Sequence, residues 1–544
     1  MIPYISIIIH FLLLSIVASS QLLAISAKAI MSPETDTLAL LALKDKLTRG
    51  IPESLPSWNH SVHFCTWEGV SCSPRHMRVS ALNLGNQNLG GTLSPAIGNL
   101  TFLKFLNLSS NGLHGEIPKE IGHLKRLQYL NLAINNLEGE IPIELANCSK
   151  LEAIVFNYNN LTGTVPFWFG SYMLQLIQLS LSANMFFGTI PSSLGNLSSL
   201  EDMALAGNNL EGSIPPTLGG LLNLQGLFLG LNNLSGIIPP SLYNLSSIEQ
   251  IDLSENRLLG SIPTNIDLAF PNLQYFSVGA NLLTGTIPPS LSNISQLKIF
   301  DIVGNRFNGP IPTSLGNLKY LKELLIDFND FGSGGGDRDL EFLSSLTNCS
   351  QLQLLTMQKN QFGGMLPDSI GNFSWQLHTL LMGHNHISGS IPEEIGKLVG
   401  LRFLDMGGNL FQGTIPVSIG KQKTLGRLYF QSNQLFGNIP DSLGNLTLLF
   451  DLDLANNNLQ GSIPVTLKHC TNLQNVFLSL NNLSGNIPHQ IFGQQEGLVI
   501  LNLSRNSFTG PLPSDLGNLK HLVELYVHDN KLKYSLIFQI LKIP

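Results

Sequence analysis

The sequence carries little charge. Only 12% of its 544 residues are Asp, Glu, Lys or Arg, about half the fraction of a typical soluble protein. The 29 basic and 36 acidic residues leave a net charge of −7, so the chain has no electrostatic attraction to nucleic acid. A hydrophobic content of 43% excludes disorder. No glycine period of three exists, which excludes collagen. Amide and hydroxyl groups must therefore keep the chain soluble.

Long apolar runs are also lacking, except at the N-terminus. Residues 5–25 are almost wholly apolar and are followed by Ala27-Lys28-Ala29, a small-x-small pattern typical of signal-peptidase sites. We therefore expect residues 1–29 to be a signal peptide. The alternative is an uncleaved anchor, because about 20 apolar residues can span a bilayer. No other stretch is long enough to predict a transmembrane helix, and an exported chain can form disulfides.

What the sequence has instead is a repeat, Leu-x-Leu-x-x-Asn-x-Leu-x-Gly-x-Ile-Pro. Gln87 replaces the Asn in the first copy, so the repeats number nineteen. Of the eighteen spacings between successive anchors, thirteen equal 24, four equal 25 and one equals 31. A register kept over this length indicates a repeat protein. The anchor asparagines are Asn111, Asn135, Asn159, Asn184, Asn208, Asn232, Asn256, Asn281, Asn305, Asn329, Asn360, Asn385, Asn409, Asn433, Asn457, Asn481, Asn506 and Asn530.

Each part of the motif has a physical role. Leu130 and Leu132 alternate with Asn131, which predicts a short strand with both leucines facing inward. The amide of Asn135 can bond the backbone groups left unpaired where the chain turns away, and stacked copies would form an asparagine ladder. Gly139 permits a tight bend, and the segment from Ile143 returns toward the next strand.

A single repeat cannot bury its own apolar face, so the copies must stack. We predict an α/β fold: a right-handed solenoid of about nineteen 24-residue repeats, with a parallel sheet on its concave side. The expected boundaries are residues 30–78 for a helical cap, 79–532 for the solenoid and 533–544 for a divergent tail. A sheet of nineteen strands would be roughly 90 Å long.

The Leu-x-Gly-x-Ile-Pro form of this repeat resembles the plant extracellular type of leucine-rich repeat. After Asn329 an insert begins at Gly332-Ser333-Gly334-Gly335-Gly336-Asp337 and continues to Asn348-Cys349-Ser350. It is similar to an interruption in the plant receptor-kinase subfamily that includes the flagellin and elongation-factor receptors. The resemblance implies an ectodomain that binds a ligand and recruits a co-receptor kinase.

The region before the repeats resembles the N-terminal cap of plant leucine-rich-repeat ectodomains. Thr35 or Asp36 could cap a helix over residues 38–44, and Trp58 precedes the segment from Cys65 to Cys72. We predict a Cys65–Cys72 disulfide; a redox or zinc motif is the alternative, but it lacks a second ligand pair. Cys148, Cys349 and Cys470 replace a core leucine in three separate repeats, so we expect them to be buried and unpaired.

The repeat breaks after Asn530, where Tyr534 replaces the expected glycine. We interpret the tail as a truncated product or gene model. In the family that the repeats resemble, a membrane span and a Ser/Thr kinase domain would follow, but no His-Arg-Asp, Asp-Phe-Gly or Val-Ala-Ile-Lys motif is present. The Gly332–Gly336 run lies between repeats and not in a phosphate-binding βαβ unit. We therefore predict no enzyme activity, catalytic residue, cofactor or metal in this chain.

Asparagine sequons are frequent and predict a glycoprotein. Eight of the fourteen, from Asn99 to Asn445, belong to return segments on the back, whereas Asn107 and Asn502 should point outward from concave strands. The sequons are Asn59, Asn99, Asn107, Asn147, Asn160, Asn196, Asn233, Asn244, Asn293, Asn348, Asn372, Asn445, Asn482 and Asn502.

The concave face is the candidate binding surface. Aromatic and arginine side chains on an exposed sheet are typical binding anchors, although any solenoid surface carries some of them. The outward positions of the middle and later repeats supply the candidates Phe228, Asp252, Asp301, Asp327, Phe328, His384, Arg402, Asp405, Arg427, Tyr429, Asp453 and Phe477.

An elongated concave sheet suits a peptide or protein ligand. The first hypothesis is an extracellular or membrane-tethered recognition ectodomain that resembles plant immune or developmental receptors, on the extracellular side of the plasma membrane. One alternative is a fragment of a Ser/Thr receptor kinase whose span and kinase domain are missing. Another is a secreted inhibitor of microbial cell-wall hydrolases. The plant leucine-rich-repeat inhibitors that this chain resembles have about half as many repeats. The sequence does not distinguish defense from development.

Overall fold

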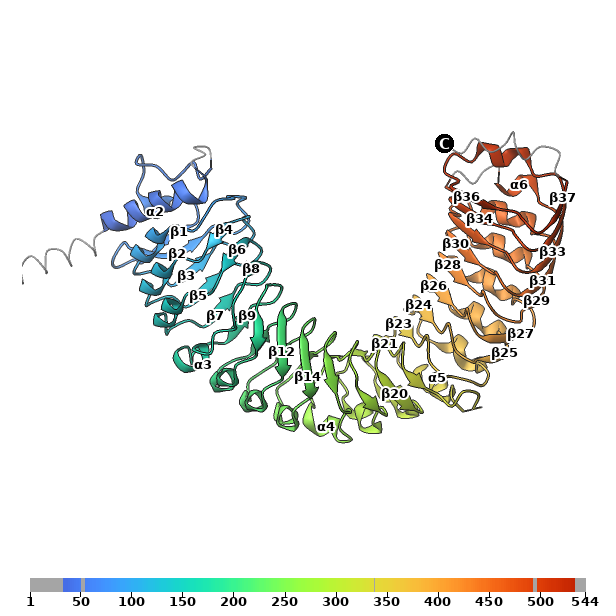
Figure 1. The fold of residues 1–544 in the computed structure, drawn as a ribbon, viewed down its shortest axis with the longest axis horizontal. Coiled ribbons are helices and arrows are strands. Elements are labelled where there is room, and N and C mark those ends of the chain that lie inside the picture. The colour runs from blue at the N-terminus through green and yellow to red at the C-terminus, as the bar shows by residue number, and fades with distance from the viewer. Residues whose placement is uncertain (1–32, 50–53, 337, 493–496, 534–544) are drawn as a thin grey trace, which may run out of the picture. The chain divides into compact units, whose positions relative to one another are not determined.

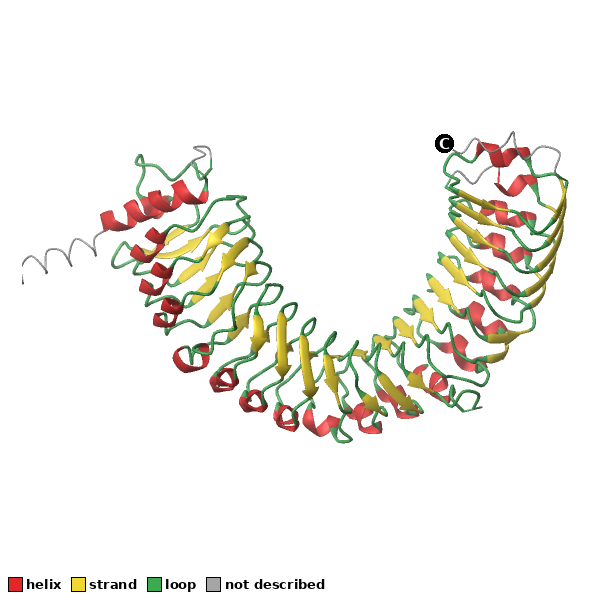
Figure 2. Cartoon of the chain, viewed as in Figure 1, coloured by secondary structure: helices red, strands yellow, loops and turns green. Residues whose placement is uncertain are grey.

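The computed structural model describes residues 33–49, 54–336, 338–492 and 497–533. The expected signal peptide and the tail from Tyr534 lie outside the described residues. The chain divides into two compact units, one up to Ile248 and one from Glu249. Within each unit, the strands of a main sheet lie on one side of the repeats and short helices lie on the other (Figure 2).

The main sheet takes one strand from each repeat and one more, β1, from the cap (Figure 1). In the first unit its strands are β1 (Val70–Cys72), β2 (Val79–Asn83), β3 (Phe105–Asn107), β5 (Tyr129–Asn131), β7 (Ala153–Val155), β9 (Gln178–Ser180), β11 (Asp202–Ala204) and β13 (Gly226–Phe228). In the second unit they are β15 (Gln250–Asp252), β17 (Tyr275–Ser277), β19 (Ile299–Asp301), β21 (Glu323–Leu325), β23 (Leu354–Thr356), β24 (Thr379–Leu381), β26 (Phe403–Asp405), β28 (Arg427–Tyr429), β30 (Asp451–Asp453), β32 (Asn475–Phe477), β34 (Ile500–Asn502) and β36 (Glu524–Tyr526).

These strands are parallel and in register with the repeat, apart from the antiparallel pair β1 and β2. Asn107 of β3 lies opposite Asn131 of β5, which is the equivalent position of the next repeat. Leu130 and Leu132 are fully buried, whereas Asn131 is half-buried on the outer side of the strand. The alternation of leucine with polar residues therefore decides which face of the sheet is covered, as predicted.

A second set of short parallel strands was not predicted. They follow the anchor asparagines. One of them ends at Gly139, which has a φ of +79°. A Cβ added there would lie 2.9 Å from Cγ of Glu116, so this position favours glycine. In the first unit they are β4 (His114–Glu116), β6 (Asn136–Gly139), β8 (Asn160–Leu161), β10 (Phe187–Thr189), β12 (Asn209–Ser213) and β14 (Asn233–Ile237). In the second they are β16 (Arg257–Leu259), β18 (Thr284–Gly285), β20 (Arg306–Gly309), β22 (Asp330–Phe331), β25 (Ser388–Ser390), β27 (Leu410–Gln412), β29 (Phe436–Asn438), β31 (Asn458–Gly461), β33 (Asn482–Asn486), β35 (Ser507–Gly510) and β37 (Lys531–Leu532).

The return segments are mostly 3-10 helices. A proline precedes most of them, and the backbone N–H of the residue after the helix bonds a carbonyl three residues back, as Cys148 does to Leu145. They are η2 (Pro95–Asn99), η3 (Lys119–His123), η4 (Ile143–Asn147), η5 (Ser192–Asn196), η6 (Pro216–Gly220), η7 (Pro240–Asn244), η8 (Pro289–Asn293), η9 (Thr313–Asn317), η10 (Asp368–Asn372), η11 (Glu393–Lys397), η12 (Val417–Lys421), η13 (Asp441–Asn445), η14 (Val465–His469) and η15 (Ser514–Asn518). A further short helix, η1 (Phe64–Thr66), belongs to the cap.

The α-helical return segments occur in the longer repeats. Of the five repeats that exceed the common length, four contain an α-helical turn, and the fifth, after Asn360, keeps the 3-10 helix η10. The extra residues allow the wider α turn, whereas a repeat of the common length fits the tighter 3-10 turn. The α-helical segments are α3 (Phe169–Tyr172), α4 (Ile266–Ala269), α5 (Glu341–Leu346) and α6 (His489–Phe492).

The asparagine ladder is present, as predicted. The side-chain amide of Asn135 donates to the carbonyls of Leu108 at 3.0 Å and Leu132 at 2.9 Å. Its Oδ1 accepts from the backbone N–H of Asn111 and of Leu113 at 3.1 and 2.9 Å. Each such amide thus joins its own turn to the preceding repeat, which pairs buried backbone groups that would otherwise cost about 1–3 kcal/mol each.

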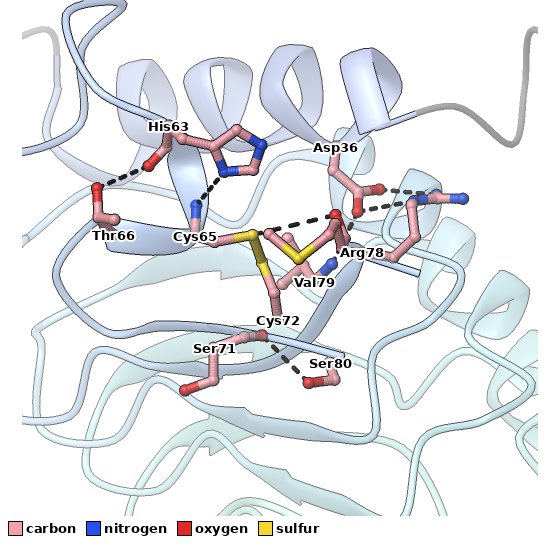
Figure 3. The surroundings of a disulfide bond; sticks show 10 residues. Asp36, His63, Cys65, Thr66, Ser71, Cys72, Arg78, Val79 and Ser80 are labelled. Carbon is pink, nitrogen blue, oxygen red and sulfur yellow. Dashed lines mark hydrogen bonds and ion pairs between the residues drawn. A yellow bond between two sulfur atoms is a disulfide. The ribbon is translucent and has the colours of Figure 1, made fainter. Parts of the chain in front are cut away.

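The N-terminal cap is built around one long helix, α2 (Pro33–Leu47). Thr35 and Asp36 lie inside α2, so the expectation that either caps the helix is wrong. Asp36 is instead turned toward the first repeat, where its carboxylate meets Arg78 (Figure 3). Nearby, the rings of Trp58 and Trp67 stack with centroids 5.5 Å apart, and both side chains are buried.

Cys65 and Cys72 form a disulfide with their Cα atoms 5.5 Å apart, close to Arg78 (Figure 3). The other three cysteines, Cys148, Cys349 and Cys470, are free and buried, as expected for core residues. Burial raises the pKa of Cys148 to about 12 and the pKa values of Cys349 and Cys470 to about 11, so these thiols are unreactive.

Candidate functional site

Several candidate residues form one row across the main sheet of the second unit. Leu381, Asp405 and Tyr429 are paired in register on β24, β26 and β28. Asp453 and Phe477 continue the row on β30 and β32. All face the side of the sheet away from the leucine core, because they alternate with buried leucine or valine. The row is therefore part of the outer face of this sheet.

The aspartates of this face are only partly available to a ligand. The carboxylates of Asp301, Asp405 and Asp453 each accept the backbone N–H two residues later, at 3.1, 2.8 and 3.0 Å. Asp252 accepts the N–H of Ser254 in the same way at 3.0 Å. These carboxylates therefore satisfy the turn after each strand, a structural role that the sequence pattern did not reveal.

Asp327 belongs to the same face and is only 8% exposed. Its carboxylate accepts from the hydroxyl of Thr356 and from the backbone N–H of Gln358. The side-chain amide of Gln358 donates in turn to Asp405 at 2.6 Å, and Asp405 is 7% exposed. This network spans the longest and most irregular repeat, the one that follows Asn329. Asp327 and Asp405 are consequently buried anchors, not exposed contacts.

Burial raises the pKa values of the aspartates on this face. It raises the pKa of Asp327 to about 6, against the lowering effect of the hydrogen bonds from Thr356 and Gln358. It also raises the pKa of Asp453 to about 6, and the pKa values of Asp301 and Asp405 rise for the same reason. These aspartates therefore lose their protons at a higher pH than ordinary aspartates do.

Arg427 is at the centre of a second cluster. Its guanidinium lies 5.4 Å from the centroid of the Phe403 ring and 5.0 Å from that of the Phe450 ring. Nε is 3.3 Å from the carboxylate of Asp451. The hydroxyl of Tyr429 donates to the same carboxylate at 3.2 Å. Burial, followed by the negative charge of Asp451, raises the pKa of Tyr429 to about 12, so Tyr429 is a neutral donor.

Phe403, Arg427 and Phe450 of this cluster also line a hollow of about 550 Å³, which we call the Arg427 cleft. Arg402 lies exposed in its wall and has no ion-pair partner among the residues that the structure describes. Arg427 has a carboxylate partner and Arg402 has none in the described part of the chain, and both lie beside two phenylalanine rings. Such a site can bind a ligand that carries an anionic group next to an apolar group. The lining residues are Thr379, Arg402, Phe403, Thr424, Gly426, Arg427, Leu448 and Phe450.

The remaining candidates do not join this cleft. Phe328 is exposed, with Nζ of Lys359 4.4 Å from its ring centroid. His384 is exposed in the turn before Asn385. Phe477 is half-buried in the row on β32, and Phe228 is half-buried on β13 of the first unit. Of the predicted residues, Arg402 and Arg427 line one cleft, and Tyr429 is joined to Arg427 through the carboxylate of Asp451.

Two residues of the site were missed. Asp451 joins Arg427 to Tyr429, and its other oxygen accepts from the amide of Asn475 at 2.5 Å. Gln358 joins Asp327 to Asp405. Asp451 occupies the outward position two residues before Asp453 on the same strand, so a search of both outward positions of every strand would have found it.

The sequons differ in exposure. Twelve of the fourteen asparagines are exposed, including all eight at the ends of return segments. Asn107 and Asn502 are half-buried, and each accepts the backbone N–H two residues later, at 3.1 Å. The two sequons expected on the strands thus have the same structural role as the aspartates of that face.

In the described ranges, no three His, Cys, Asp or Glu side chains are grouped so that they could hold a metal ion. The same residues contain no helix with the length and apolar character that a membrane crossing requires.

A helical cap followed by stacked 24-residue repeats with an asparagine ladder defines a leucine-rich-repeat protein. The sequence matches the leucine rich repeat N-terminal domain family over residues 33–73. It matches the Leucine Rich Repeat family in nine segments, at 102–124, 126–148, 175–197, 223–245, 296–318, 376–398, 424–446, 449–470 and 497–519.

Among curated relatives, the chain is 51% identical over 83 residues to the LRR receptor-like serine/threonine-protein kinase EFR of Arabidopsis thaliana. The match covers 15% of this chain and spans 8% of that protein. Among solved structures, the LRR ectodomain of the plant membrane receptor kinase GASSHO1/SCHENGEN3 of Arabidopsis thaliana, in complex with CASPARIAN STRIP INTEGRITY FACTOR 2, is similar with a TM-score of 0.76 and 31% identity. The similarity covers 91% of this chain and 64% of that one.

The LRR ectodomain of the Arabidopsis receptor kinase HAESA, solved with an IDA peptide hormone ligand, is 30% identical with a TM-score of 0.70. That similarity covers 92% of this chain and 90% of the HAESA chain. HAESA has also been solved with IDA and the co-receptor SERK1, at 29% identity and a TM-score of 0.66, covering 92% of this chain and 94% of that one. The chain belongs to the family of plant leucine-rich-repeat receptor kinase ectodomains, which confirms the resemblance expected from the repeats.

Proposed function

We propose that the chain is an extracellular recognition ectodomain that binds a peptide or protein ligand on the outer face of its main sheet. The Arg427 cleft supports this most directly, because it joins two arginines to two phenylalanine rings on that face. Relatives that match nearly the whole chain, such as HAESA, are ectodomains solved with a peptide ligand. No chemistry is assigned to this chain.

The cleft favours a ligand segment that carries a carboxylate beside an apolar side chain. The apolar side chain would pack on Phe403 and Phe450, and the carboxylate would pair with Arg402, which has no counter-charge within the described ranges. Charge-assisted pairs with arginine combine strength with directional specificity. The half-buried Tyr429 and Asp453 of the adjacent row would contact the rest of the ligand.

Export and a co-receptor belong to the same proposal. The apolar N-terminal segment and the disulfide in the cap are typical of a chain made in the secretory pathway, and the exposed sequons are available for glycosylation. HAESA has been solved with a co-receptor and a peptide together. We propose that this chain likewise recruits a co-receptor once ligand is bound.

The test begins with capture. The secreted chain is immobilised, exposed to peptides extracted from plant extracellular fluid, and the retained peptides are identified by mass spectrometry and resynthesised. Arg402→Ala, Arg427→Ala and Tyr429→Ala should each weaken binding of these synthetic peptides by about tenfold, while the thermal unfolding midpoint is retained.

Lys319→Ala is the matched control, because Lys319 is an exposed cation beside the return helix η9. It should leave the affinity unchanged. Equal affinity of the wild type and all three cleft variants would show that the ligand binds elsewhere.

A further inference from the structure

The residue immediately before each anchor asparagine from Ser110 onward has a positive φ, mostly near +55°, and lies along one edge of the main sheet in its unit. We call these positions the edge row. The left-handed conformation is unfavourable for large side chains. Five members of the row are nevertheless large and apolar, with exposed fractions of 42–61%: Ile134, Tyr158, Leu231, Phe328 and Leu480.

Single exposed apolar side chains are normal on a protein surface, but neighbouring ones along one edge, such as Ile134 and Tyr158, offer apolar surface that a bound group can cover. Three of the five have a sequon two residues later, on the same edge. Tyr158 precedes Asn160, Leu231 precedes Asn233, and Leu480 precedes Asn482. Of the fourteen sequons, these three directly follow an anchor asparagine. Each of the three therefore lies two residues after a large apolar member of the edge row.

The other two large members are also accounted for. Phe328 lies under the ammonium group of Lys359. Ile134 lines a hollow of about 560 Å³ in the first unit together with Tyr158 of the next repeat and Asn160 itself. The described residues that line this hollow include no charged side chain, and its polar side-chain groups are asparagine amides, the Ser110 hydroxyl and the Tyr158 phenol. Its chemistry differs from that of the Arg427 cleft and offers nothing to an ionic ligand.

A sugar ring matches this surface. A pyranose presents C–H groups on one face, which pack on aromatic or aliphatic side chains, and its hydroxyl and acetamido groups bond to side-chain amides. An N-acetylglucosamine attached to Asn160 is tethered at the wall of the hollow, so its local concentration there is high. The side chain of Asn160 is exposed and open to attachment.

We infer that N-linked glycans at Asn160, Asn233 and Asn482 pack back onto the edge row, and that the first sugars at Asn160 occupy the hollow between Ile134 and Tyr158. Attachment forms a bond from the Asn160 amide nitrogen to the anomeric carbon of a polyprenyl-pyrophosphate-linked oligosaccharide. The amide nitrogen loses one proton, and the lipid pyrophosphate leaves with the bonding electrons. The inference rests on the proposed export of the chain, but not on any ligand.

The consequence concerns binding. With the hollow filled by sugar, the apolar edge of the early repeats is closed to a peptide, whereas the Arg427 cleft has no sequon among its lining residues. The glycans would therefore restrict recognition to the charged and aromatic face of the second unit.

The test compares the secreted wild type with Thr162→Ala, which removes the Asn160 sequon but leaves Tyr158 and Asn160 in place. Ser198→Ala is the matched control, because it removes the Asn196 sequon at the end of η5, where the residue two positions earlier, Leu194, is buried. Mass spectrometry gives the occupancy of Asn160, and hydroxyl-radical footprinting gives the labelling rate of the Tyr158 side chain.

A packed glycan should make Tyr158 label about threefold more slowly in the wild type than in Thr162→Ala, while Ser198→Ala labels like the wild type. Trimming the wild-type glycan to one N-acetylglucosamine should preserve most of the protection. An unoccupied Asn160, or equal labelling of Tyr158 in the wild type and Thr162→Ala, would overturn the inference. Peptide binding at the Arg427 cleft is measured separately, so either proposal can fail alone.

Discussion

Asp36 and Arg78 form a buried, two-pronged ion pair that fastens the cap helix to the first repeat. Arg78 Nη2 lies 2.7 Å from Asp36 Oδ1, and Nε lies 2.9 Å from Oδ2. The same Oδ2 accepts the backbone N–H of Val79 at 2.8 Å, at the start of β2 (Figure 3). Both side chains are almost fully buried. The pair thus joins the cap helix to the N-terminal end of the solenoid, where the first layer of core leucines would otherwise be exposed to solvent.

Breaking this pair from one side should loosen the cap. Asp36→Asn leaves the Arg78 guanidinium buried without its counter-charge, which costs about 3–5 kcal/mol in comparable pairs. We expect the amides of α2 to exchange hydrogen much faster, with little change in the second unit. Arg505→Ala is the control, since its pair with Asp529 is exposed and should contribute less than about 1 kcal/mol. Unchanged protection of α2 in Asp36→Asn would contradict this role.

The ladder allows a comparison between neighbouring asparagines. Asn457 is buried, donates to the carbonyls of Phe430, Leu454 and Ala455, and accepts from the N–H of Leu435. Asn458 is exposed on β31. Asn457→Ala should lower the thermal midpoint clearly, because each buried group left unpaired costs about 1–3 kcal/mol. Asn458→Ala should be almost neutral. Equal midpoints for both variants would show that water replaces the ladder.

The repeat pattern was sufficient to predict the backbone of each unit. Leu130, Leu132 and Asn135 recur at one period, so strand direction, buried face and ladder follow from spacing alone. The pattern could not show whether a return segment is α or 3-10, because repeats of 25 residues contain either kind of turn. The second set of strands was missed because Asn136–Gly139 has only one inward leucine and gives no alternation to detect.

The candidate site was less predictable. The period places Arg402, Arg427 and Tyr429 on one face, and the structure brings them together. The period cannot show that Asp405 bonds its own turn or that Asp327 bonds Thr356 and Gln358 of the next repeat, since a short acid can either accept such bonds or face solvent. Asp36 and Arg78 are far apart in the sequence and lie outside the repeats, so no period connects them.

The raised pKa of Asp327 predicts a pH-dependent stability. The folded protein holds this proton up to about pH 6, whereas an unfolded chain loses it near pH 4. Between these values the folded state binds more protons, so wild-type stability falls as the pH rises through this window. Asp327→Asn has no such titration and can still pair with Thr356 and Gln358. Relative to the wild type, the free energy of unfolding of Asp327→Asn should therefore rise by about 1–2 kcal/mol between pH 5 and pH 7.5.

The measurement is the unfolding midpoint of both proteins at pH 5, 6 and 7.5. Asp441→Asn, an exposed position on η13, controls for the loss of one negative charge. Parallel pH profiles for the wild type and Asp327→Asn would contradict the prediction.

Replacing Asp451 should strengthen peptide binding, whereas replacing Arg402 or Arg427 should weaken it. Its carboxylate lies 3.3 Å from Arg427 and partly neutralises it. Asp451→Asn should leave Arg427 available to an acidic ligand, so that peptides selected by the wild type bind about three- to tenfold more tightly, or about 1 kcal/mol. Arg402→Glu should weaken the same peptides more than Arg402→Ala does. Both changes should shrink in high salt, because exposed charges are screened.

Binding of one synthetic peptide is measured by calorimetry at low and high salt, with Asp529→Asn as the control because its ion pair with Arg505 is outside the cleft. If Asp451 only holds Tyr429 and Arg427 in place, Asp451→Asn will weaken binding like the alanine variants, since the cluster loses its shared acceptor. If the carboxylate competes with the ligand, binding strengthens. The sign of the change therefore separates a positioning role for Asp451 from an electrostatic one, and only the second agrees with a ligand that carries its own acid into the cleft.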